Sequence, residues 1–150
     1  MTATLLLRLL ERVHGHLGWL SVGALLHPAI LLRQRRRRAR LSVSLATGLV
    51  AVTALLGAYI YPSYRDRIKQ HLFIEAPKLG WMFERKEHLA VGAVAFALVG
   101  WVSHFALPLV AGGGGEQSLA RLAHWAFVLA FAFALVAAVL GVSVASYRSF

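Results

Sequence analysis

The sequence contains no cysteine among its 150 residues. Disulfides, thiolate metal sites and cysteine nucleophiles are therefore excluded, although the redox compartment stays open. The chain also lacks a phosphate-binding loop, a dinucleotide fingerprint and the HExxH and GxSxG patterns of hydrolases. Its GGGG run follows no predicted strand and carries no lysine. We therefore expect no catalytic activity from the chain alone.

Acidic residues are scarce as well, with six against sixteen lysines and arginines, and the formal net charge is +10. A charge of this size is often typical of nucleic-acid binding. Six of the basic residues, however, lie in the single stretch 33–40, between two apolar runs. A basic loop at a bilayer surface explains that placement better, so we predict a lipid bilayer as partner and no nucleic acid.

Apolar residues are abundant, at 59% of the chain, whereas soluble domains have about half or less. A helix needs about twenty apolar residues to cross the hydrocarbon core of a membrane. We therefore predict an all-α fold, an integral membrane four-helix up-and-down bundle that forms a single transmembrane domain over residues 1–150. The predicted spans cover residues 5–32, 41–61, 88–110 and 119–146.

A helical loop at the membrane interface is expected between the second and third spans. Tyr64, Ile68 and Leu72 fall near one helical face there, which favours a short interfacial helix. Pro77 and Gly80 should end this helix before the chain turns into the third span.

The hexapeptide FERKEH precedes the third predicted span. Glu84 and Glu87 would complement the positive N-terminal end of that helix. We also expect His88 to point inward toward the first helix, with Arg85 and Lys86 turned out to the headgroups.

The arginine-rich stretch 33–40 also bears on orientation. Cytoplasmic loops carry an excess of lysine and arginine, so we place this loop in the cytoplasm and both termini on the other side. The expected location is the inner membrane of a bacterium.

Histidine supplies most of the polar residues within the spans, and such residues are candidates for function. Counted from the edge that bears the arginine-rich loop, His27, His104 and His124 lie at one depth, about 9 to 10 Å inside. Near the opposite edge, His14 or His16 of the first helix can meet His88 of the third. The spacing therefore predicts two layers of imidazoles.

Small residues share a narrow face of the third predicted helix with His104, namely Ala93, Ala97 and Gly100. Such a face leaves space for a flat macrocycle or for the close approach of another helix.

Two imidazoles that face each other across a bundle can take both axial positions of a haem iron. Alternatively, His104 and His124 hydrogen-bond to hydroxyls such as that of Ser103, or to carbonyls freed by Pro28 and Pro108. Passage of protons or ions along the histidines is a third interpretation.

The chain resembles the four-helix membrane cytochromes of the b type in its four spans and in three motifs: HGHLGWLSVGALLHP, EH before the third span and GWVSH within it. The resemblance implies haem b, with His16 paired to His88 and His27 paired to His104 or His124. The histidine spacing differs between the first and third helices, so one haem in the layer of three fits more easily than two.

We thus predict a haem b electron-transfer subunit, which other membrane redox subunits would accompany. The alternatives are an accessory or structural membrane subunit without redox activity, and a bundle that conducts protons or ions.

Overall fold

The chain is described by a computed structural model that covers residues 2–34, 39–112 and 114–147. Its four long helices are α1 (Thr2–Arg33), α2 (Arg40–Tyr64), α4 (Pro77–Ala106) and α5 (Glu116–Tyr147). Three shorter elements are the π-helical turn η2 (Arg65–Lys69), the helix α3 (Gln70–Glu75) and the 3-10 turn η3 (Leu107–Val110).

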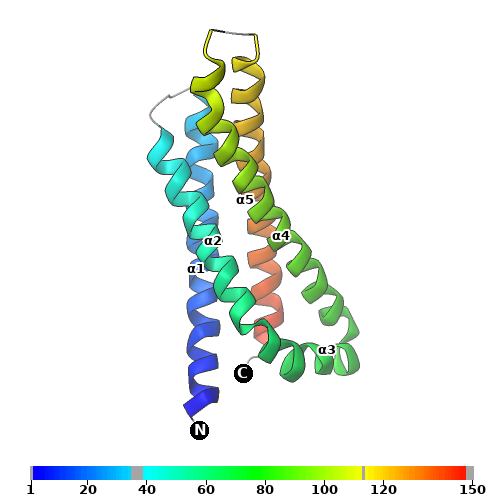
Figure 1. The fold of residues 1–150 in the computed structure, drawn as a ribbon. Coiled ribbons are helices and arrows are strands. Elements are labelled where there is room, and N and C mark those ends of the chain that lie inside the picture. Colours follow the sequence, from blue (N-terminus) through cyan, green and yellow to red (C-terminus); the bar gives the residue numbers. More distant parts are fainter. Residues whose placement is uncertain (1, 35–38, 113, 148–150) are drawn as a thin grey trace.

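The long helices run in alternating directions along one another (Figure 1). α1 packs against α2 and α5, and α4 packs against the same two helices. Figure 1 shows both chain ends and α3 at one end of the molecule, which we call the α3 end. The last turn of α1, the start of α2, η3 and the start of α5 lie at the opposite end, the arginine end. Residues 35–38 of the predicted cytoplasmic loop lie outside the described residues.

Each of the four long helical stretches is long and apolar enough to cross a membrane: Leu5–Arg33, Arg40–Glu75, Pro77–Val110 and Glu116–Tyr147. The prediction of an all-α chain with four such helices is therefore confirmed. Large apolar side chains remain exposed on all four, among them Leu20, Leu55, Val91 and Val136. Contact with lipid, rather than with water, accounts for an apolar surface of this extent.

The core of the described bundle combines a few large side chains with many alanines. Leu25 of α1, Val43 of α2, Ala97 of α4 and Phe127 of α5 are all fully buried and belong to one cluster. Alanines from each helix complete it, and such small residues let helix backbones approach closely. The core therefore depends on close contact between helices more than on bulky apolar layers.

The segment predicted as a helical loop between the second and third spans is helical almost throughout and continues directly from α2. The second predicted span ended at Tyr61, but the helical path continues through η2 and α3 to Glu75. Only Ala76 interrupts it, with φ −145° and ψ 72°. The residue before a proline is disfavoured in the α region, and Pro77 then takes the first position of α4, where no N–H is needed.

Tyr64, Ile68 and Leu72 do share a helical face, but that face packs inside the molecule. All three are buried, against Phe83 of α4 and Val144 of α5. The rings of Tyr64 and Phe83 stack with their centroids 5.2 Å apart. Burial of these side chains favours continued helix, because an early turn at this point would expose them.

Gly80, which was predicted to end a helix, lies inside α4 and is buried. A Cβ atom there would come within 2.8 Å of the Phe73 ring. The glycine therefore allows α3 to close against α4 rather than ending a helix.

The packing of α4 on α5 leads to a test at Gly100, where a Cβ would lie 2.7 Å from the fully buried Phe127 ring. We expect Gly100→Ala to lower the free energy of unfolding by about 1–3 kcal/mol, because the ring has no free space into which it can move. Thermal unfolding in detergent measures the change. Gly48→Ala is the matched control, since nothing lies within 4 Å of a Cβ there and alanine favours helix. Equal melting temperatures for the two variants would contradict this account of the packing.

Candidate functional site

His104 stands out among the histidines of the chain. It lies near the C-terminal end of α4, is 4% exposed, and has no hydrogen-bond partner for either ring nitrogen. Within the described residues, these two nitrogens are the only buried side-chain nitrogen or oxygen atoms that lack a hydrogen-bond partner. Buried polar groups are normally bonded, so His104 is an exception among the described residues.

The surroundings of His104 are aromatic and basic. The Phe105 ring lies edge-on to its imidazole, with centroids 5.8 Å apart. Arg40, at the start of α2, lies within electrostatic range. The predicted bond to the Ser103 hydroxyl is not formed, although Ser103 is also buried.

The other two members of the predicted layer, His27 and His124, lie at a similar level along the bundle. His27 Nδ1 is 2.7 Å from Ser42 Oγ of α2, and that helix meets α4 through a Trp101 to Ser44 hydrogen bond. His124 Nδ1 donates to the Ala29 carbonyl of α1 at 2.9 Å. Helical rise places these contacts within about one turn, or about 5 Å, of His104.

Each histidine of this layer nevertheless has different neighbours. His27 is exposed, His124 is half-buried against α1, and only His104 lies fully inside. Among the described residues, no group of three histidines or carboxylates could hold a bare metal ion. With Nδ1 protonated, His124 retains a lone pair on Nε2, which is the nitrogen a metal would need.

The face of small residues on α4 is occupied by neighbouring helices. A Cβ on Gly100 would meet the Phe127 ring, and one on Gly92 would meet the Phe133 ring. On the α2 side, Thr47 Oγ1 donates to the Ala97 carbonyl at 3.5 Å. Between Gly92 and Gly100, the face therefore serves close packing of α4 against its neighbours.

The structure does not bring the predicted outer pair together inside the bundle. His16 and His88 are both exposed, and each Nδ1 bonds to a carbonyl one turn earlier on its own helix, those of Arg12 and Glu84. The prediction that His88 points inward was wrong. On α1 it is His14 that faces a neighbour, because its Nδ1 donates to the Thr53 carbonyl of α2 at 3.1 Å.

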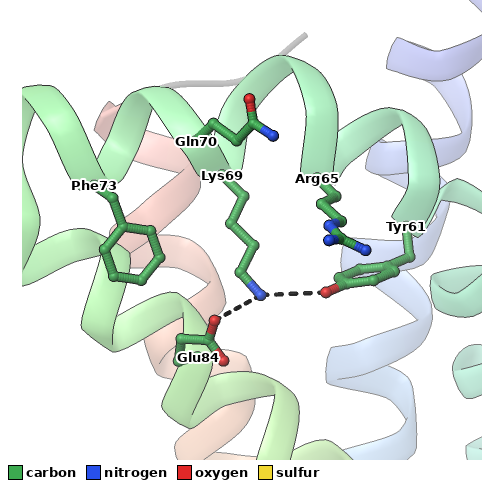
Figure 2. A pocket seen from close by; sticks show the side chains of 6 residues that line it. All are labelled: Tyr61, Arg65, Lys69, Gln70, Phe73 and Glu84. Carbon is green, nitrogen blue, oxygen red and sulfur yellow. Dashed lines mark hydrogen bonds and ion pairs between the residues drawn. The ribbon is translucent and has the colours of Figure 1, made fainter.

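A cluster of charges at the α3 end was missed by the sequence analysis. Lys69 of η2 forms ion pairs of 2.8 Å with both Glu84 and Glu87 of α4, and it donates to the Tyr61 hydroxyl at 3.2 Å. Figure 2 shows Lys69 reaching from η2 across to α4. Because α4 already begins at Pro77, the two glutamates lie beyond its first turn and bind this lysine instead of complementing the helix dipole.

Lys86 was predicted to turn toward the headgroups, and it does not. It is half-buried, with Nζ 4.4 Å from the centroid of the Phe83 ring and 5.8 Å from that of Tyr64. Glu11 of α1 lies within electrostatic range of it, as does Glu87. The two rings compensate part of the desolvation of this lysine.

Comparison with protein-family models, with curated proteins and with solved structures finds no match to this chain.

The Lys69 cluster leads to a test of stability. Lys69→Ala removes the cation that bridges Glu84 and Glu87, so we expect a loss of about 1–3 kcal/mol in the free energy of unfolding. Chemical or thermal unfolding in detergent measures it. Lys78→Ala, at an exposed site of α4, should leave stability unchanged. If both variants unfold alike, the ion pairs do not stabilise the contact between η2 and α4.

Proposed function

We propose that the protein is an integral membrane electron-transfer subunit that holds one b-type haem at His104. The proposal is supported by four helices that are long and apolar enough to span a membrane, together with a buried imidazole inside them. The single observation that carries it is the lack of a hydrogen-bond partner for both ring nitrogens of His104.

In this proposal the four helices cross the bilayer in alternating directions as one up-and-down bundle. The basic stretch 33–40 faces the cytoplasm, because lysine and arginine are retained on that side. Both chain ends and α3 then lie on the outer side of a bacterial inner membrane. Other membrane redox subunits supply and accept the electrons.

His104 is the residue best suited to bind the haem iron, and His124 is the better candidate for a second ligand. His104 offers a buried imidazole, and His124 on the adjacent α5 offers Nε2 while the Ala29 carbonyl orients its ring through Nδ1. A bond of this kind to the second ring nitrogen is typical of metal-ligating histidines. His27 is exposed and bonded to Ser42, so it is the weaker second ligand. When bound, haem supplies one-electron transfer, and the surrounding apolar side chains exclude water.

An accessory membrane subunit without redox activity is the second candidate. It is favoured by the packing of Phe127 and Phe133 onto the glycines of α4, which fills the face where a macrocycle was expected. In that function, His27 and His124 serve to link helices through their hydrogen bonds.

Absorption spectroscopy separates the two candidates. Protein purified in detergent from haem-replete cells should show a Soret band, b-type bands after dithionite reduction and about one haem per chain. His104→Ala should reduce the haem content by about tenfold or more, because it removes the buried ligand. His71→Ala, an exposed histidine of α3, is the control and should keep the spectrum. A colourless wild-type protein would contradict the haem proposal and favour the accessory function.

The exposed histidines of the predicted outer pair give a separate test. Because His16 and His88 bond to their own helices at the surface, we expect His16→Ala and His88→Ala to leave both the haem content and the midpoint potential unchanged. Redox titration of the two variants measures this. A shifted potential in either one would show that an outer haem site exists.

A further inference from the structure

An open pocket of about 330 Å³ lies at the α3 end of the molecule. Its lining comes from the last turns of α2, from η2 and α3, and from one side chain of α4: Tyr61, Arg65, Lys69, Gln70, Phe73 and Glu84. A volume of this size falls within the range of small-ligand sites. The π-helical turn that forms one wall is also a rare element, found often at functional sites.

Two of the pocket's charged side chains are not equally available to a ligand. An ammonium has three N–H groups, and Lys69 uses its own on Tyr61, Glu84 and Glu87. Arg65 is exposed, and no described residue bonds its guanidinium. Figure 2 shows Arg65 and Lys69 extending from η2 on the side of Tyr61. Arg65 is therefore the free cation of the pocket.

The pocket also offers one acceptor. Lys69 Nζ binds Glu84 through Oε1, so the second carboxylate oxygen has no partner among the described residues. With two lysine-bound carboxylates close by, the pocket is nearly neutral overall. The carboxylates would repel a small dianion. A zwitterionic ligand would instead pair its negative group with Arg65 and its positive group with Glu84.

Aromatic residues place the pocket at the level of the membrane surface. Trp81 is exposed and lies edge-on to the pocket residue Phe73, with ring centroids 5.7 Å apart. Tyr59 of α2 is exposed nearby on the same helix as Tyr61. Tryptophan and tyrosine prefer the headgroup layer of a bilayer, so the pocket opens where lipid headgroups lie.

We propose that this pocket binds the zwitterionic headgroup of a phospholipid of the phosphatidylethanolamine type. The Arg65 guanidinium holds the phosphodiester, since its planar donors match phosphate oxygens. The headgroup ammonium lies against the free oxygen of Glu84, and the rings of Tyr61 and Phe73 border the headgroup. The site does not depend on haem, so its test is independent of the electron-transfer proposal.

Native mass spectrometry of the full chain in detergent, titrated with phosphatidylethanolamine, tests the site. We expect Arg65→Ala to weaken binding by about tenfold, the loss of one charge-assisted contact. Arg67→Ala is the matched control, because Arg67 is an exposed arginine of the same turn that does not line the pocket. It should bind lipid as the wild type does. Equal binding by the wild type and both variants would overturn the proposal.

Two further titrations identify the source of the phosphate. Phosphatidylglycerol lacks the ammonium, so wild-type protein should bind it more weakly than phosphatidylethanolamine, and a preference for the glycerol lipid would overturn the zwitterionic assignment. Inorganic phosphate at equal concentration should not displace the lipid. Displacement would show a site for a free anion instead. Arg65→Gln, which keeps a polar side chain, should lose binding as Arg65→Ala does, with unchanged thermal unfolding in both.

Discussion

The contact between α4 and α5 at two glycines sets the arrangement on which the rest of the molecule depends. Gly92 and Gly100 lie about two turns apart, and each faces a phenylalanine ring of α5, Phe133 and Phe127. Any side chain at either glycine would hold the helices apart. The contact fixes the rotation of α4 about its axis, and this rotation buries His104, one turn after Gly100, while Trp101 stays exposed.

At the α3 end, a different interaction closes the structure. Lys69 binds two carboxylates of α4, and Lys86 lies over the stacked rings of Tyr64 and Phe83. Partly buried charges are costly unless they are paired. Here the pairing with Lys69 offsets that cost for Glu84 and Glu87 of the hexapeptide FERKEH.

The two ends of the molecule therefore differ in how their buried polar groups are bonded. At the α3 end, lysines, glutamates and a tyrosine hydroxyl satisfy one another, so the free groups lie at the open pocket. At the arginine end, His104 is enclosed by the helices with both nitrogens unbonded. A ligand at the first site would come from the membrane surface, whereas a ligand at the second would have to be built in as the helices assemble.

The sequence by itself determined the four apolar helices, because runs of about twenty apolar residues separated by polar stretches permit little else. It also predicted a common level for His27, His104 and His124, since helical rise converts residue spacing into depth. It predicted a separate short interfacial helix after Tyr61, whereas the helical path runs on from α2 and buries Tyr64, Ile68 and Leu72 inside the molecule. Only the tertiary structure decided which faces point inward. The helical period shows which side chains share a face of one helix, but close packing with neighbouring helices sets the rotation of that helix about its axis. In α4 this rotation leaves His88 exposed and Lys86 half-buried.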